Sequence, residues 1–99
     1  MSWATHAKEA LRRGETVRVR PHGNSMRGKI SDGDLVTLVP CDPATLQVGD
    51  IVLVHLHGAD YLHLIKAIQS DRYLIGNNRG RINGWAGKQA IYGKATQIE

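Results

Sequence analysis

Three of the five histidines of this chain lie close together in sequence, and they are the side chains best suited to chemistry near neutral pH. An imidazole titrates at about pH 6.5, so it can accept or release a proton, and its neutral form also ligates metals. His55 and His57 alternate along one predicted strand, and His63 lies on the next. If the two strands pair, all three imidazoles can share one face of a hairpin. Such a face would provide either a general base or a zinc site.

Zinc binding is the less favoured of these two interpretations. Cys-x-x-Cys and His-Glu-x-x-His elements, which make zinc binding specific, do not occur in the sequence. The single cysteine, Cys41, lies between Pro40 and Asp42 in a predicted loop with no base next to it, so we expect an unreactive thiol. We therefore predict neither a metal nor another cofactor.

The hairpin that must position the histidines is predicted from two strands, residues 51–57 and 61–68, joined by Gly58-Ala59-Asp60. Pairing His57 with Tyr61 places His55 opposite His63, and the histidines then share their face with Ile51, Leu53, Tyr61 and Ile65. The other face is predicted to be core, formed by Val52, Val54, Leu56, Leu62, Leu64 and Ile68.

The rest of the chain is predicted to be mainly β. Trp3, Ala7 and Leu11 recur at helical spacing, which indicates one short N-terminal helix over 3–12 that stops before Gly14. Further strands are predicted at 16–20, 35–39, 72–75 and 90–98, the last with a bulge at Gly93. These strands and the hairpin give about six strands in all. Trp85, in Ile82-Asn83-Gly84-Trp85, is expected to be a core or lid aromatic outside them.

Length and composition are those of one small globular domain. The 99 residues are 41% apolar and 22% charged, so we expect a single domain over 1–99 with a modest core. The net charge of +4 would suit a nucleic acid, but the basic residues are scattered along the whole chain. We therefore do not expect nucleic-acid binding.

Compartment is inferred from what the sequence lacks. One cysteine forms no internal disulfide, and no secretory leader precedes the helix, which is typical of a reducing compartment. The most apolar region, residues 51–68, is interrupted by histidines, Asp60 and Lys66 and cannot span a bilayer. We expect a soluble, cytoplasmic protein without a membrane partner.

Five short elements occur in an order that is characteristic of a known superfamily. They are Gly23-Asn24-Ser25-Met26, Gly33-Asp34-Leu35-Val36, Val48-Gly49-Asp50-Ile51-Val52, the strand with His63 and Lys66, and Gly76-Asn77-Asn78. From about residue 17 to 98 the chain resembles the serine peptidase superfamily of signal peptidases and LexA-like repressors, and it is closest in pattern to the Ser-His signal peptidase type. The resemblance implies a small, curled, barrel-like β fold.

The resemblance also implies catalytic residues. Ser25 takes the place of the family's nucleophile, and a serine hydroxyl needs a neighbouring base to remove its proton. Bacterial signal peptidases and LexA-like proteins use a lysine on the later strand, whereas the endoplasmic reticulum and archaeal enzymes use a histidine. His63 matches the histidine version and is the preferred base. Lys66 is the alternative, but strand alternation points it to the opposite face, and burial would have to lower its pKa.

Supporting residues follow from the same resemblance. The family's oxyanion hole implicates the backbone amide of Ser25 and the side chain or amide of Asn24, and Met26 is expected to line the substrate groove or to pack in the core. Members with a histidine base usually carry an acid in a Gly-Asp-Asn element, where this chain has Asn77. An asparagine can orient an imidazole without supplying charge, so Asn77 is the candidate orienting residue.

The sequence thus predicts a soluble serine endopeptidase that cleaves an extended peptide with small side chains, with Ser25 as nucleophile and His63 as general base. The partner is then a peptide or protein substrate. The alternative is a catalytically inactive relative that keeps the groove and binds a peptide or protein. Substrate, cleavage site and oligomeric state are not predicted.

Overall fold

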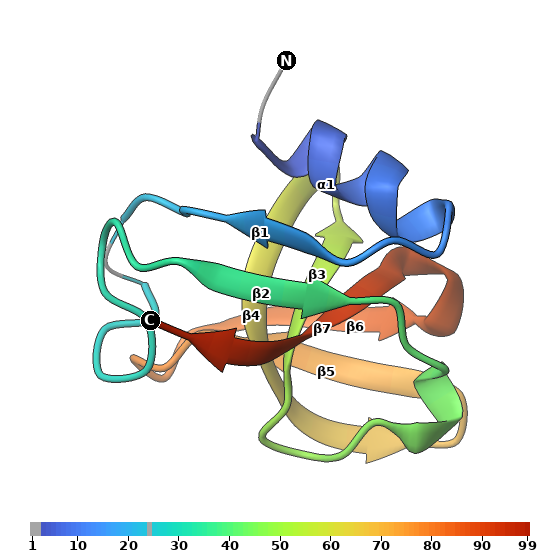
Figure 1. The fold of residues 1–99 in the computed structure, drawn as a ribbon. Helices are drawn as coiled ribbons and strands as arrows, with labels where there is room; N and C mark the ends of the chain where they lie inside the picture. The colour runs from blue at the N-terminus through green and yellow to red at the C-terminus, as the bar shows by residue number, and fades with distance from the viewer. Residues whose placement is uncertain (1–2, 24) are drawn as a thin grey trace.

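The structure, a computed structural model, describes residues 3–23 and 25–99. Over these residues seven antiparallel strands form one sheet in the order β1-β2-β7-β3-β4-β5-β6, so β1 and β6 are its open edges (Figure 1). The mainly β prediction is confirmed, with one strand more than expected. In chain order the elements are α1 (Trp3–Arg12), β1 (Val17–Val19), β2 (Val36–Val39), a 3-10 turn (Pro43–Thr45), β3 (Ile51–Leu56), β4 (Ala59–Gln69), β5 (Arg72–Gly76), β6 (Ile82–Gly87), a second 3-10 turn (Lys88–Ala90) and β7 (Ile91–Ile98).

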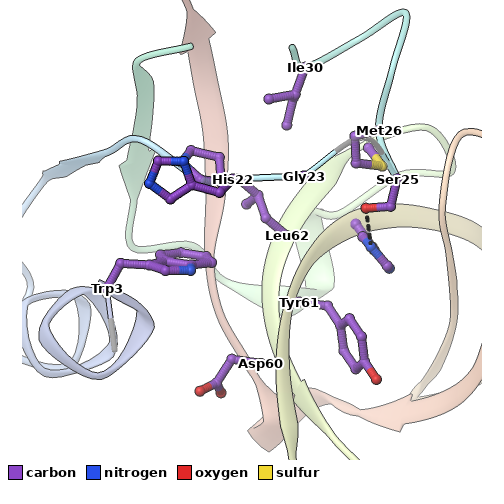
Figure 2. A pocket seen from close by; sticks show the side chains of 11 residues that line it. Trp3, His22, Gly23, Ser25, Met26, Ile30, Asp60, Tyr61 and Leu62 are labelled. Carbon is purple, nitrogen blue, oxygen red and sulfur yellow. Dashed lines mark hydrogen bonds between the residues drawn. The ribbon is translucent and has the colours of Figure 1, made fainter. Parts of the chain in front are cut away.

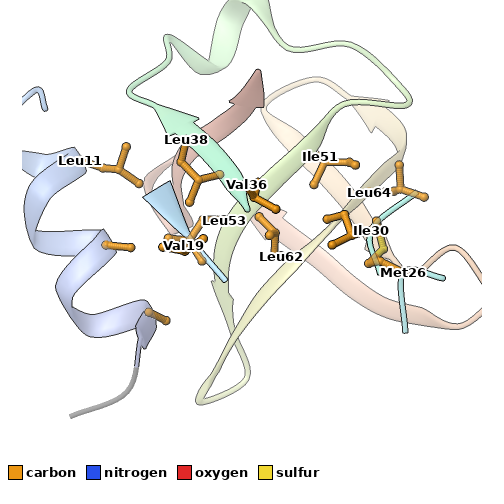
Figure 3. Packing of buried hydrophobic residues seen from close by; sticks show 12 residues of the cluster. Leu11, Val19, Met26, Ile30, Val36, Leu38, Ile51, Leu53, Leu62 and Leu64 are labelled. Carbon is orange, nitrogen blue, oxygen red and sulfur yellow. The ribbon is translucent and has the colours of Figure 1, made fainter. Parts of the chain in front are cut away.

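The sheet curls so that both faces of its central hairpin are buried. Side chains alternate along β3, and Ile51 and Leu53 enter one apolar cluster while Val52 and Val54 enter another. Figure 3 shows the first cluster, which receives Leu11 from α1. The second cluster lies under β5 and β6 and includes Leu46, Leu56, Ile65, Tyr73, Ile75, Ala86 and Ile91. The β3–β4 hairpin is therefore held from both sides.

Helix α1 covers the first cluster and has the predicted bounds. Ala4, Ala7 and Leu11 form its buried stripe, at the spacing expected of an amphipathic helix. The predicted bulge in β7 is also present, because Leu53 pairs with Gly93 and Val54 with Ile91. A Cβ at Gly93 would lie 2.9 Å from the Leu11 methyl carbons, so the absence of a side chain at Gly93 lets helix and sheet approach closely.

The predicted register of the central hairpin is wrong. His55 pairs with Asp60 and Val52 with His63, and the turn is the two-residue His57-Gly58, with φ of 52° and 79°. Positive φ at both positions is the signature of the tight turn that matches strand twist. Gly58-Ala59-Asp60 resembles a three-residue loop in sequence, but Ala59 already belongs to β4.

The corrected register changes which side chains share a face. The pairing is displaced by an odd number of residues, so His63 lies with Val52 and Val54 instead of with His55. The prediction that the histidines share one face is therefore wrong. Side chains still alternate along each strand, but the different register places His55 and His63 on opposite faces. Across residues 3–23 and 25–99, no three His, Cys, Asp or Glu side chains gather closely enough to hold a metal ion.

Strand β6 is the element that the sequence did not reveal. Its Asn83-Gly84 pair is typical of a turn, yet Ile75 pairs with Gly84 and Leu74 with Trp85. Trp85 is 38% exposed on this edge strand, so it is not a core aromatic, and the lid alternative stays a prediction. In the described part of the chain, no helix is long and apolar enough to cross a membrane.

Candidate active site

Ser25 lies in the loop between β1 and β2, which is tied together across its base. The Gly23 amide, at φ 110°, donates to the Asp32 carboxylate at 2.8 Å, and the Arg20 guanidinium donates to the Gly33 carbonyl at 2.8 Å. Glycine is needed at this positive φ because a side chain would be strained there. These bonds hold the segment that presents the serine.

The far side of the loop is fastened to the core and to the segment after β5. Met26 is 4% exposed and packs with Ile30 in the first cluster, while it also lines the pocket at Ser25. The Asn78 amide donates to the Ser25 carbonyl at 3.2 Å, and the Asn78 side chain donates to the Arg27 carbonyl at 2.8 Å. Met26 thus packs in the core and lines the pocket, and its contact with a substrate stays a prediction.

His63 comes from β4 and meets Ser25 directly. Its Nε2 lies 3.2 Å from Ser25 Oγ, and its Nδ1 lies 2.8 Å from Asn83 Oδ1 on β6. An amide oxygen only accepts hydrogen bonds, so this contact requires the hydrogen on Nδ1, and in a neutral ring the lone pair then lies on Nε2. The free lone pair therefore faces the serine hydroxyl, as general-base chemistry requires.

The surroundings of His63 favour its neutral form. Burial lowers the pKa of His63 below its ordinary value, the hydrogen bond to Asn83 opposes this change, and the positive charge of Arg81 adds to it. The Tyr61 ring lies 4.9 Å from the imidazole, centroid to centroid. Near neutral pH the imidazole is therefore ready to accept a proton.

Lys66, the alternative base, has a different position. It is the additional residue where β4 bulges against β5, since Ile65 pairs with Ile75 and Ala67 with Leu74. Its Cε lies 3.1 Å from the point that a Cβ on Gly76 would occupy. Among the described residues that line the pocket at Ser25, His63 is present and Lys66 is not.

The asparagine that contacts His63 is Asn83 and not Asn77, the residue of the motif. The Asn77 side-chain oxygen accepts from the Arg79 and Arg81 amides at 2.8 and 3.0 Å and so shapes the turn after β5. Asn83, which sequence reasoning missed, reaches His63 instead. A prediction of strand β6 from the sequence would have been the way to find Asn83. The predicted role of Asn24 in an oxyanion hole lies outside the described residues.

A pocket of about 200 Å³ adjoins the Ser25–His63 pair. Figure 2 shows Ser25 on one side of it and Trp3 and His22 on the other, with Leu62 between them. Apolar side chains and one carboxylate, Asp60, complete a mixed surface next to the hydroxyl. A peptide carbonyl carbon brought to Ser25 would thus have apolar side chains beside it.

His55 lies on the other face of the hairpin with its own partners. Its Nδ1 lies 2.8 Å from Asp60 Oδ1, and Lys8 Nζ from α1 lies 2.9 Å from the same oxygen. Burial acts against the charge of Asp60, but the hydrogen bonds from His55 and Lys8 outweigh it and lower the pKa of the carboxyl. This cluster joins the hairpin to the helix.

Comparison with known families gave a match over nearly the whole chain. Residues 4–94 match the family described as Peptidase S24-like. Searches of curated proteins and of solved structures found no match. The family match spans nearly the whole chain, from α1 to β7, and includes the serine loop, the histidine strand and β6. This chain therefore belongs to the Peptidase S24-like family.

Proposed function

We propose that the chain is a serine endopeptidase in which Ser25 is the nucleophile and His63 the general base. The observation that carries the proposal is the 3.2 Å separation of Ser25 Oγ and His63 Nε2. This separation is at the upper end of hydrogen-bond reach for a nucleophile and its base, and such contacts are often longer without substrate. The family match adds support, because it is to a peptidase family.

The reaction then follows from the positions of the protons. His63 Nε2 takes the proton of Ser25 Oγ as the oxygen bonds to the substrate carbonyl carbon. The scissile C–N bond breaks, and the same proton passes from Nε2 to the leaving amine, which leaves an ester on Ser25. Water, deprotonated by Nε2, cleaves this ester and restores the hydroxyl. The hydrogen on Nδ1 stays in place throughout.

An extended peptide with small side chains suits the pocket. Its volume of about 200 Å³ is below the range of about 300–1,000 Å³ typical of drug-sized ligand sites. Met26, Ile30 and Leu62 supply apolar contact next to Ser25. A short apolar side chain fits such a space without displacing the core.

The test uses a fluorophosphonate probe, because it reacts with activated serines and needs no known substrate. We expect stoichiometric labelling of Ser25, loss of labelling in Ser25→Ala, and no loss in Ser31→Ala, which removes an exposed serine from the same loop. A library of peptides with small side chains should be cleaved by wild type and by Ser31→Ala but not by Ser25→Ala. Equal labelling of wild type and Ser25→Ala would exclude Ser25 as the nucleophile.

Binding without catalysis is the second candidate function. The amide of Asn83, in place of a carboxylate at His63, favours it, because an amide does not stabilise the imidazolium by charge. In that case the wild type retains extended peptides on a column but shows neither cleavage nor fluorophosphonate labelling. Ser25→Ala would then bind the same peptides with similar affinity.

A further inference from the structure

The side chain of Asn83 is directed at His63 by an irregularity in an edge strand. Gly76 pairs with Ile82 and Ile75 with Gly84, so Asn83 is the additional residue of a bulge between them. Bulges redirect a side chain and are common next to active sites. The neighbouring side chains of Ile82 and Trp85 are exposed, whereas the Asn83 amide reaches His63 Nδ1 at 2.8 Å.

A close approach on the adjacent strand holds this bulge in place. A Cβ at Gly76 would come within 2.6 Å of the Arg81 carbonyl oxygen, which accepts a hydrogen bond from the Asn77 amide at 2.9 Å. The absence of a side chain at Gly76 therefore lets the start of β6 lie against the end of β5. Asn77 shapes the turn, and Asn83 contacts the imidazole.

We propose that Asn83 is the positioning residue of this site: its side-chain carbonyl holds His63 with Nδ1 protonated and Nε2 facing Ser25. This inference rests on the proposed function for its catalytic meaning. The residue that orients the histidine therefore lies on β6 and not in the Gly76-Asn77-Asn78 element. It also assigns the site a neutral amide where Ser-His-acid peptidases have a carboxylate.

The neutral partner has an electrostatic consequence. When Nε2 takes the serine proton, the imidazolium gains no opposite charge from Asn83, and Arg81 acts against it. Tyr61 and Ser25 also face the ring, the first with its aromatic ring and the second with its hydroxyl. A carboxylate at position 83 would accept the same Nδ1 hydrogen and stabilise the positive ring.

The first measurement is the tautomer and titration of His63 by nitrogen and carbon NMR of the labelled imidazole. We expect the Nδ1–H tautomer in wild type, its loss in Asn83→Ala, and a His63 pKa higher by about one unit or more in Asn83→Asp. Asn77→Asp is the matched control, with the same chemical change in the same region but no contact with His63. Its effect on the His63 pKa should be clearly smaller.

The second measurement is the rate of fluorophosphonate labelling across pH in the same variants. Asn83→Ala should lower the rate about tenfold or more, and Asn83→Asp should restore it to at least the wild-type value. Restoration by the carboxylate separates positioning from a merely structural role. Asn77→Asp should change the rate less than either variant.

The two proposals fail in different ways. No labelling of wild type Ser25 would overturn the proposed peptidase function, while the NMR experiment would still test the Asn83 contact. An Nε2–H tautomer in wild type would overturn the positioning role. Equal pKa changes in Asn83→Asp and Asn77→Asp, or an unchanged labelling rate in a folded Asn83→Ala, would overturn it as well.

Discussion

His55 and His63 belong to one hairpin but have opposite surroundings. His55 is half-exposed, and its partner is the Asp60 carboxylate, which also binds Lys8. His63 is buried, and its partners are the Asn83 amide and the Ser25 hydroxyl. The charged partner, Asp60, thus belongs to His55 and not to the histidine beside the serine. Within residues 3–23 and 25–99, the side chains that hydrogen-bond to the histidine beside the nucleophile are both neutral.

Burial explains the difference. Burial also acts against the charge of Asp60, but the hydrogen bonds from His55 and Lys8 outweigh this cost and keep the carboxylate charged. Beside the buried His63 a second charge would have to be desolvated, whereas an amide satisfies Nδ1–H without this cost. His63 is therefore held neutral and oriented at rest, and it receives less help when it becomes charged. The following experiments test this contrast.

Removing the two imidazoles should give the largest contrast. His63→Ala should lower the fluorophosphonate labelling rate about 100-fold or more, because the base that activates Ser25 is lost. His55→Ala is the matched control on the other face of the hairpin and should label at nearly the wild-type rate. Comparable losses in the two variants would refute the assignment of His63 as base.

Gly76→Ala should disturb the contact between Asn83 and His63 by displacing the backbone of β6. Its Cβ would come within 2.6 Å of the Arg81 carbonyl oxygen and 3.1 Å of Lys66 Cε, so β6 must move. We expect a loss of about 1–3 kcal/mol in the free energy of unfolding, measured with denaturant, and weaker protection of the Nδ1 hydrogen. Gly87→Ala, where a Cβ meets nothing within 4 Å, should be close to neutral. Similar losses in both variants would contradict the close-packing argument.

Asp60→Asn should lower the free energy of unfolding by about 1 kcal/mol at pH 7, because it removes the charge that Lys8 and His55 contact. The folded chain lowers the pKa of Asp60, so the charged form stabilises the fold above the ordinary carboxyl pKa. That contribution is lost as pH falls through the lowered value. The difference between wild type and variant should therefore hold from pH 7 down to about the ordinary carboxyl pKa and shrink below it in denaturant unfolding. Glu9→Gln, at an exposed carboxylate of α1, is the control; a constant difference would argue against this pairing.

Lys66→Ala should have the smallest effect. Because the pKa of His63 is lowered, the labelling rate should rise with pH through a midpoint below 6.5 and then level. The variant should keep this midpoint and most of the rate, since Lys66 lies at the β4 bulge next to Gly76. A midpoint above about pH 8 that disappears in Lys66→Ala would identify the lysine as base instead.

Local pattern was sufficient for much of this molecule. The alanine and leucine spacing of α1, the alternation in β2 and β3 and the bulge at Gly93 follow from short-range sterics and hydrophobic periodicity. The family motifs pointed to Ser25 and His63, and the structure brings these two side chains within 3.2 Å. Such features can be predicted from residues close in sequence or from the short motifs of the family.

Tertiary structure alone decided the hairpin register and the partner of His63. A turn at His57-Gly58 instead of Gly58-Ala59-Asp60 exchanges the faces on which the side chains meet, and the local sequence is compatible with both. Asn83-Gly84 has the composition of a turn, and it becomes strand because β5 offers its edge and Gly76 permits close approach. The Asn83–His63 contact joins residues 20 positions apart across three strands. No local propensity encodes such a contact, because it exists only once β4, β5 and β6 are packed together.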